Sequence, residues 1–240
     1  MDDIYSEMMG FLKANSISES QHPQSTPESG LHPFITISRE YGAGGTSLAK
    51  ALLKHFDRQD SSVFKGWQII DNNLCEKLES DNRLNHAVRD LLSEEYYSEV
   101  QAFVYSLLGD PSQKTLVYKE LFDSIRTLAT FGKVIIIGRA GCCITESLPM
   151  GVHLRLAASL QSRVARVRKR HRDPLKAIQQ KDRDRARLIK VHFQRDINDP
   201  LLYDMVCNTD RLGFEEMARM SAELVRARTE ESAAYREQAV

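Results

Sequence analysis

The feature that most constrains the fold is a short apolar run that leads directly into a glycine-rich turn. Residues 34–47 read FITISREYGAGGTS, and the β-branched start of this stretch is typical of a strand. After the turn, Leu48, Leu52 and Phe56 recur at helical spacing and predict an apolar helix face. Glycines between a strand and a helix allow successive backbone N–H groups to point inward. The segment therefore predicts a strand, a turn suited to anion binding, and a helix.

The turn departs from the phosphate-binding template G-x-x-x-x-G-K-[ST]. With Gly44 at the second glycine of the template, Arg39 falls on the first glycine and Gly45 on the lysine. Thr46 keeps the hydroxyl position, and either it or Ser47 can cap the helix and reach a magnesium ion. A plain strand-to-helix turn without a ligand is the competing interpretation. Phosphate chemistry here needs a cation from elsewhere, and Arg39 is the nearest candidate.

Further apolar runs alternate with helical patterns along the chain. Strands are expected at 67–70, 134–137, 152–156 and 203–207, with a final helix at about 214–235. This alternation predicts a parallel sheet that helices cover on both sides. Ligands gather at the carboxyl ends of the strands in such sheets. Arg39, Asp71 and Arg139 each follow or end a predicted strand, which makes them candidate ligand contacts.

A strongly basic segment follows the fourth predicted strand. Between Arg163 and Lys190 there are twelve Lys and Arg residues against three Asp, whereas the whole chain balances 33 basic with 33 acidic residues. A lid that brings arginines to a triphosphate, a solvated helix face and a nucleic-acid patch are the three interpretations. The guanidinium of arginine can form two parallel hydrogen bonds to a phosphate group, which favours the lid interpretation. Within the segment, Asp184 and Arg187 stand at i, i+3 spacing, and we expect them to pair.

The composition limits the classes of protein to which the chain can belong. The chain has 240 residues, of which 42% are hydrophobic, and a formal net charge of +0 gives no global attraction to nucleic acid or membrane. Its four cysteines show no CxxC spacing, so neither a zinc site nor a disulfide framework is predicted. No apolar stretch reaches the length of a membrane span. We expect a soluble, cytoplasmic protein whose residues 1–32 form a short helix and a flexible linker ahead of a folded domain.

Several segments, in this order, resemble the cytidylate-kinase-like family, a branch of the P-loop nucleoside monophosphate kinases. They are ITISREYGAGG, IIDNNL, VIIIGRAG and DRARLIKVHFQRDINDPLLYDMVCNT, together with the closing helix. The resemblance runs from about Pro33 to Leu224. It implies a three-layer α/β P-loop kinase fold with a five-stranded parallel sheet of order 2-3-1-4-5. It also implies one domain over 33–240, with a nucleoside-monophosphate-binding region at about 73–130 and a lid at about 160–195.

The resemblance further implies ATP as phosphoryl donor, magnesium as cofactor and a nucleoside monophosphate as acceptor. The turn would hold the ATP phosphates and magnesium through Gly42, Ala43, Gly44, Gly45, Thr46 and Ser47, with Thr46 as the metal ligand. Arg139 resembles the arginine that binds the acceptor phosphate. Asp71 resembles an anchor on the acceptor side or an outer-sphere ligand of magnesium, and a helix-capping carboxylate is the competing interpretation. The expected catalytic residues, which stabilise charge on the transferring group, are Arg39, Arg163, Arg166, Arg183 and Arg187.

One position separates the chain from the true cytidylate kinases, which carry a lysine where this chain has Gly45. Ser38, Arg39 and Glu40 instead match the form S-R-E-x-G-x-G-G, which looks typical of this branch. Two alternative functions therefore stay open: a nucleotide-binding sensor or partner protein without turnover, and a nucleic-acid binder that uses the basic segment. Tyr203 and Asp204, at the start of the last predicted strand, are expected to be architectural.

Overall fold

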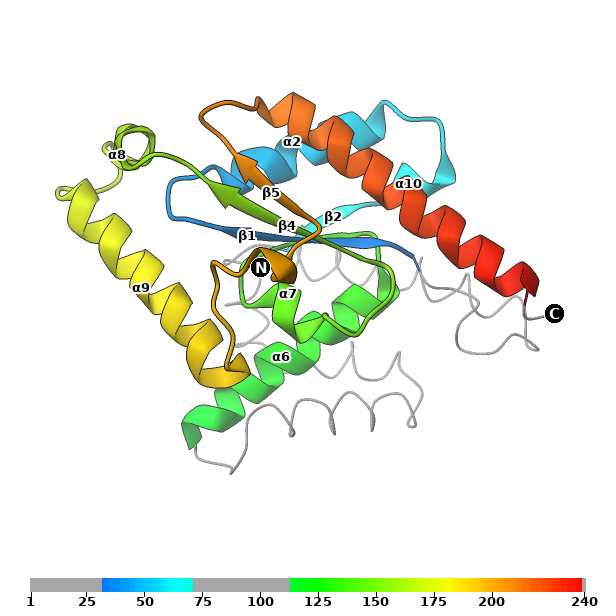
Figure 1. Cartoon of the computed structure of the whole chain (residues 1–240), viewed down its shortest axis with the longest axis horizontal. Helices are drawn as coiled ribbons and strands as arrows, with labels where there is room; N and C mark the ends of the chain where they lie inside the picture. The colour runs from blue at the N-terminus through cyan, green and yellow to red at the C-terminus, as the bar shows by residue number, and fades with distance from the viewer. Residues whose placement is uncertain (1–31, 71–112, 239–240) are drawn as a thin grey trace, which may run out of the picture.

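A computed structural model describes residues 32–70 and 113–238 of the chain (Figure 1). The expected N-terminal extension, most of the expected acceptor region and Asp71 lie outside the described residues. The central element is a five-stranded parallel sheet. Its strands are β1 (Phe34–Arg39), β2 (Gln68–Ile70), β3 (Val134–Ile137), β4 (Gly151–Ala157) and β5 (Met205–Asn208). Their order is β2-β3-β1-β4-β5, which confirms the order expected from the sequence.

The first strand lies at the centre of the sheet. Its Ile35 pairs with Ile135 of β3 on one side and with Val152 of β4 on the other. The β3 strand is buried along its whole length, as an apolar strand covered on both faces should be. Because all strands are parallel, the residues that follow β1 and β3 meet at one edge of the sheet.

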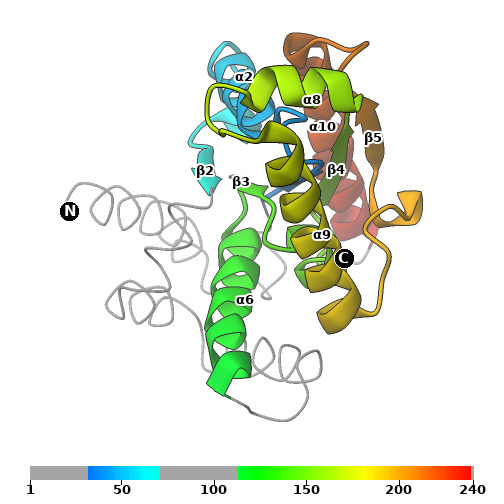
Figure 2. The same ribbon diagram turned by 90° about the vertical axis from the view of Figure 1, so that its left-hand side faces the viewer.

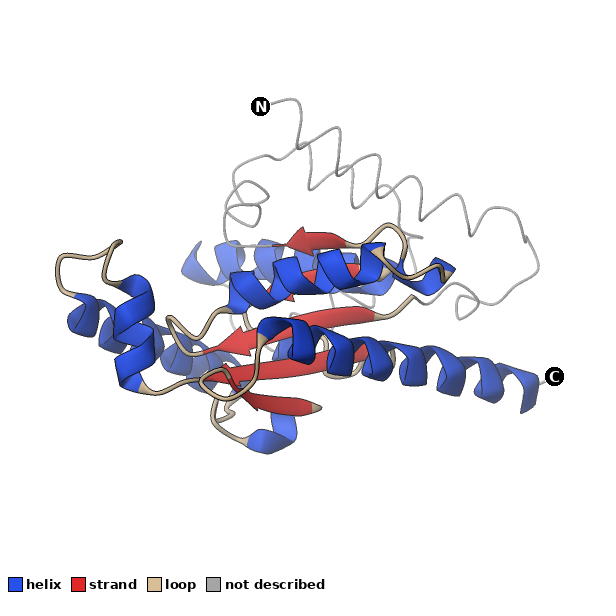
Figure 3. Ribbon diagram, turned by 90° about the horizontal axis from the view of Figure 1, so that it is seen from above, coloured by secondary structure: helices blue, strands red, loops and turns tan. Residues whose placement is uncertain are grey.

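Helices form a layer on each face of the sheet (Figures 1 and 3). On one face, α2 (Gly45–Asp57) and α10 (Phe214–Gln238) pack over a core that includes Leu48, Leu52 and Met217. On the other face, α6 (Gln113–Phe131) and α7 (Gly141–Ile144) pack over a second core that includes Phe122 and Ile136. The predicted apolar face of α2 is therefore buried as expected, and the fold has three layers.

Two further helices, α8 (Leu160–Val167) and α9 (Pro174–Phe193), lie beyond the carboxyl ends of the strands (Figure 2, where they face the viewer). Ser159 caps α8 by accepting a hydrogen bond from Ser162 N, and Asp173 caps α9 in the same way from Lys176 N. Gln194 ends α9 in a left-handed conformation. These helices coincide with the basic segment, and we call α8, α9 and the loop between them the lid.

The observed strands differ from the predicted ones at their ends. β1 continues to Arg39, so the arginine is part of the strand. β5 begins at Met205 rather than at residue 203, because Asp199 caps a 3-10 turn, η2 (Pro200–Leu202), whose end ties Tyr203 N to Pro200 O at 3.1 Å. A second 3-10 turn, η1 (Ser62–Phe64), precedes β2. No helix in the described part of the chain is both long and apolar enough to span a membrane.

Candidate active site

The glycine-rich turn, residues 40–44, joins β1 to the N-terminus of α2, and we call it the phosphate turn. Gly42 and Gly44 have φ of +87° and +98°, values that favour glycine over residues with a side chain. The first helical hydrogen bond runs from Leu48 N to Gly44 O at 2.9 Å, so the amides of residues 45–47 precede the helical ladder. The side chains of Thr46 and Ser47 are exposed, and no acidic residue stands in the first turn of α2. The turn and helix therefore suit a phosphate group.

The side chain of Arg39 lies against Gly45, the residue at the lysine position of the template. A Cβ added to Gly45 would lie 3.3 Å from both Cγ and Cδ of Arg39, so the arginine stem covers this glycine. A Cβ added to Gly138, at the end of β3, would lie only 1.7 Å from Arg39 Nη1. Arg39 thus passes between two glycines, one at the start of α2 and one at the end of the neighbouring strand. Its stem therefore lies beside Gly45, and its guanidinium lies beside Gly138.

A cavity of about 610 Å³ opens beside Arg39, between the strand ends and α9. Its charged lining consists of Arg39, Arg139, Lys181, Asp184, Arg185 and Arg187. Among these described residues, five are cations and one is an acid. This excess of positive charge suits an anionic group such as phosphate.

Arg139 reaches the cavity from a strained turn after β3. Gly138, Arg139 and Ala140 all have positive φ, at 79°, 54° and 57°. The turn closes with a hydrogen bond from Gly141 N to Gly138 O at 2.9 Å, after which α7 begins. Two successive residues with side chains in the left-handed region are uncommon and cost free energy. The structure thus holds Arg139 at the strand end that the sequence pointed to.

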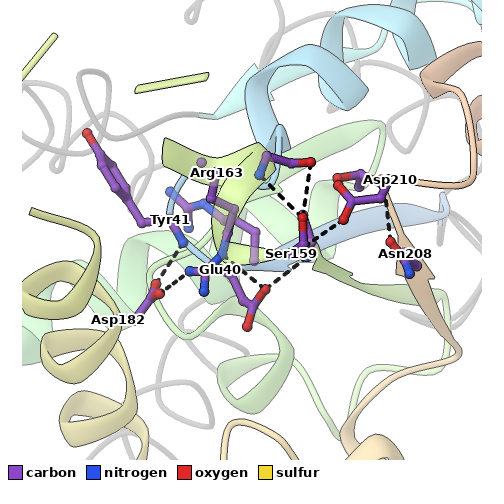
Figure 4. Close-up of polar contacts among 12 residues, drawn as sticks. Glu40, Tyr41, Ser159, Arg163, Asp182, Asn208 and Asp210 are labelled. Carbon is purple, nitrogen blue, oxygen red and sulfur yellow. Dashed lines mark hydrogen bonds and ion pairs between the residues drawn. The ribbon is translucent and has the colours of Figure 1, made fainter. Parts of the chain in front are cut away.

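The two expected arginines of the first lid helix connect elements to one another. Arg163 pairs with Asp182 of α9 and approaches Glu40 Oε2 at 3.5 Å (Figure 4). Arg166 donates to Gly42 O at 3.3 Å and to the hydroxyl and carbonyl oxygens of Thr209 at 2.8 and 2.9 Å. Neither lines the cavity. Arg163 joins the two lid helices and faces the turn, whereas Arg166 holds the lid against the turn and against the loop after β5.

The basic residues of the second lid helix differ in whether they line the cavity. Arg187 lines it, as expected of a site residue, whereas Arg183 is not part of the lining and donates to Gln180 Oε1 at 3.1 Å. The expected pairing of Asp184 with Arg187 is wrong, because Asp184 Oδ1 accepts from Gln180 Nε2 at 2.8 Å, one turn back along α9. Sequence reasoning missed Arg185 as a cavity residue, although its spacing from Lys181 and Leu188 marked a common helix face.

A buried polar network supports the end of β1. Arg155 is 7% exposed, and its guanidinium donates to Ser38 Oγ at 3.0 Å and to Asn198 Oδ1 at 3.1 Å. Tyr203 donates its hydroxyl to Ile197 O at 2.8 Å, and burial raises its pKa to about 12. Sequence reasoning missed Arg155 as a supporting residue, because nothing in the sequence around this arginine indicates which distant side chains it contacts. The network fixes Ser38, the residue before Arg39.

The loop after β5 is tied to the start of the lid (Figure 4). Asp210 Oδ2 accepts from Ser159 N at 2.7 Å, and Asp210 N donates to Asn208 Oδ1 at 2.9 Å.

Asp204, before β5, accepts from His153 N at 2.7 Å and pairs with Arg228 at 2.7 Å. These contacts agree with the architectural role expected of Tyr203 and Asp204.

A magnesium ion would have to draw on hydroxyl and phosphate oxygens at this site. In the described ranges, no group of three or more His, Cys, Asp and Glu side chains is placed to hold a metal. Magnesium often binds with few protein ligands together with substrate phosphates and water. The exposed hydroxyls of Thr46 and Ser47 fit that mode of binding.

A solved structure shares this fold. An uncharacterized protein from Eubacterium ventriosum ATCC 27560 matches with a TM-score of 0.61 and 18% sequence identity, over 82% of this chain and 99% of that chain. A shikimate kinase from Bacteroides thetaiotaomicron matches with a TM-score of 0.46 and 16% identity, over 81% and 98% of the two chains. The first match supports the fold alone, because its identity is low. Comparison with curated proteins found no match.

The sequence identifies a family, which is more specific than a shared fold. The profile of the cytidylate kinase-like family matches residues 34–211. That span begins with β1 and includes the phosphate turn, the β3 end with Arg139, the lid and the loop after β5. Phosphoryl transfer is the general chemistry that such a family supports. The chain belongs to the cytidylate kinase-like family.

Proposed function

We propose that the protein transfers a phosphoryl group from ATP to a small acceptor, a nucleoside monophosphate. The observation that carries this proposal is the course of Arg39 between Gly45 and Gly138. It gives the phosphate turn a cation in place of the lysine that Gly45 replaces. Family membership and the basic cavity beside Arg39 add independent support.

The donor side consists of the turn and the start of α2. In this proposal, the amides of residues 42–47 and the helix N-terminus bind the ATP phosphates. Magnesium would take the hydroxyl of Thr46 and would neutralise charge on the phosphates. Arg39 stabilises the charge that develops on the transferring group, where a fixed cation in a partly buried site is most effective.

The acceptor side consists of the cavity. Arg139 and Arg187 bind and orient the acceptor phosphate, with Lys181 and Arg185 adding positive charge. We assign acceptor recognition to the region at about 73–130 and closure over the reactants to the lid at about 160–195, within a domain over 33–240. Catalysis then rests on positioning, exclusion of water and charge stabilisation, without a covalent intermediate.

The test is turnover with a panel of acceptors. The protein is incubated with ATP, magnesium and each nucleoside monophosphate in turn, and ADP and nucleoside diphosphate are quantified together. The proposal expects equal amounts of both products with at least one acceptor. ATP binding measured by calorimetry, with no product from any acceptor, would reject the assignment.

A nucleotide-binding protein without turnover is the second candidate. The observation that favours it is Glu40, whose carboxylate stands beside the turn and 3.5 Å from Arg163 Nε, so that it neutralises a cation of the lid. This candidate predicts saturable ATP binding and protection of the lid from proteolysis without product. Steady product formation that depends on Arg39 excludes it.

A further inference from the structure

Asp182, on the lid helix α9, contacts three separate groups, of which Figure 4 labels Tyr41 and Arg163. Its Oδ1 accepts a hydrogen bond from Tyr41 N, in the phosphate turn, at 2.7 Å. Its Oδ2 pairs with Arg163 Nη1 of α8. Arg185, one turn further along α9, places Nη1 3.6 Å from Oδ1. A single carboxylate therefore joins the turn to both helices of the lid.

These contacts are partly shielded from water. The side chain of Arg163 is 11% exposed and that of Asp182 is 29% exposed. Glu40, which also faces Arg163, is held in turn by the amide of Ala158 at 2.9 Å. An ion pair with restricted access to water is screened less than a surface pair, and loss of one partner leaves the other charge without compensation. Removal of one charge at this junction should therefore cost more than removal of one partner of a surface ion pair.

The turn residue Tyr41 is held by the lid at two further points. Its hydroxyl lies 2.7 Å from His171 Nε2, in the loop between α8 and α9. Its ring lies under the guanidinium of Arg185, with Cζ 5.3 Å from the ring centroid. Gly42 adds close backbone contact, since a Cβ there would lie 3.0 Å from Arg163 O. The lid and the phosphate turn are therefore in direct contact along the whole start of the turn.

Asp182 also determines where Arg185 stands. Arg185 lines the cavity, and its Nη1 donates to Arg39 O at 3.3 Å as well as facing Asp182. The carboxylate on one side and the Tyr41 ring on the other restrict the guanidinium. Arg185 is thereby placed at the backbone of Arg39, beside the site of the proposed transfer.

We propose that Asp182 is a latch residue, a positioning residue that fastens the lid to the phosphate turn and fixes Arg185 in the cavity. Asp182 does not touch the reactants; it acts through Tyr41, Arg163 and Arg185. Its consequence for phosphoryl transfer rests on the proposed function, whereas the latch itself rests only on contacts within the chain.

The experiment measures residue-resolved amide hydrogen exchange by NMR on the full chain. Asp182→Asn keeps the size of the side chain but removes the charge, and Asp184→Asn makes the same change two residues along α9. Hydrogen bonds to charged groups are the stronger class, so Asp182→Asn is expected to raise exchange of the Tyr41 amide at least about tenfold. Asp184→Asn is expected to leave it within about twofold of wild type. Amides of Ile135–Ile137 in β3 report on the whole fold and should not change.

A second variant and a second readout guard against a general loss of structure. Arg163→Gln removes one partner of Asp182. It is expected to raise hydrogen exchange of the Tyr41 amide by a smaller factor, because Asp182 keeps its charge and its contacts with Arg185 and the Tyr41 amide. In both variants the ring signals of His171 should move toward those of a solvated histidine. Signals and exchange rates at wild-type values in both variants would overturn the latch. Absence of turnover in the wild type would reject the proposed function and leave the exchange result decisive for the latch.

Discussion

The guanidinium of Arg39 lies directly against Gly138, where a Cβ would stand 1.7 Å from Nη1. The stem of the same arginine covers Gly45, the residue at the lysine position of the phosphate-binding template. Glycine at both positions leaves the space through which Arg39 passes. The absence of the lysine and the presence of the arginine are therefore parts of one arrangement.

Gly138→Ala is the first substitution that this arrangement predicts to be harmful. The added methyl group would displace the Arg39 guanidinium, and the φ of +79° is unfavourable for alanine. We expect a loss of roughly 1–3 kcal/mol in the free energy of unfolding together with a loss of phosphoryl transfer. Urea unfolding and product formation measure the two effects.

Gly66→Ala is the matched control, because Gly66 has the same φ of +79° but no atom within 4 Å of an added Cβ. The Gly66→Ala variant introduces the same backbone strain without displacing Arg39, so it should retain activity. Equal activity in the two variants would show that the position of Arg39 does not matter.

Arg139→Ala tests the acceptor side. Arg139 lines the cavity at the end of β3, so its removal should weaken binding of the acceptor phosphate. A charge-assisted contact of this kind is worth about 1.5–3 kcal/mol, so KM for the acceptor should rise roughly 10- to 100-fold with little change in KM for ATP. Steady-state kinetics with each substrate varied in turn gives both constants.

Arg183→Ala makes the same chemical change outside the cavity, where the side chain contacts only Gln180 among its described partners. We expect its kinetic constants to stay within about twofold of wild type. If Arg183→Ala raised KM for the acceptor as much as Arg139→Ala does, the assignment of Arg139 would be wrong.

The sheet and the phosphate turn could be predicted because their signals are local. A buried parallel strand is apolar throughout, and three glycines with a following helical pattern specify the turn from one stretch of sequence. The resemblance to the family then gave the strand order, which local patterns do not contain. The structure confirms the order β2-β3-β1-β4-β5.

The lid could not be resolved to single residues from the sequence. Its arginines look alike along the chain, but their roles depend on which helix face meets the cavity. Arg163 and Arg166 contact Asp182 and Thr209, partners that are 19 and 43 residues away. Arg155 was missed for the same reason, because its partners Ser38 and Asn198 come from distant segments. Such pairings arise only in the folded chain.

The stability of the protein should depend on pH through His153. Its Nδ1 lies 2.8 Å from Thr36 Oγ1, and burial lowers the pKa of this ring below 6.5 in spite of the nearby carboxylate of Asp204. The unfolded chain therefore binds the proton more readily than the folded chain does. The free energy of unfolding should be highest above pH 6.5 and should fall as the pH drops below it.

Urea unfolding at pH 7.5 and pH 5.5 measures this effect. In His153→Gln the difference between the two pH values should shrink, even though the variant is less stable at pH 7.5 because the packing around Thr36 changes. His192, whose pKa burial also lowers, should account for part of the remaining difference. An unchanged pH dependence in His153→Gln would contradict the assignment.

The central claim is that Arg39 supplies the cation that the phosphate turn lacks, and three rates test it most directly. The initial rate of ADP formation, with saturating ATP, magnesium and acceptor, is compared for wild type, Arg39→Ala and the double variant Arg39→Ala/Gly45→Lys. Loss of a cation that stabilises the transferring group costs on the order of 10³ in rate, so Arg39→Ala should fall by about that factor. Removal of the arginine stem opens the space over Gly45, and a lysine there should restore the rate at least about tenfold over the single variant. Arg39→Ala at the wild-type rate would contradict the account.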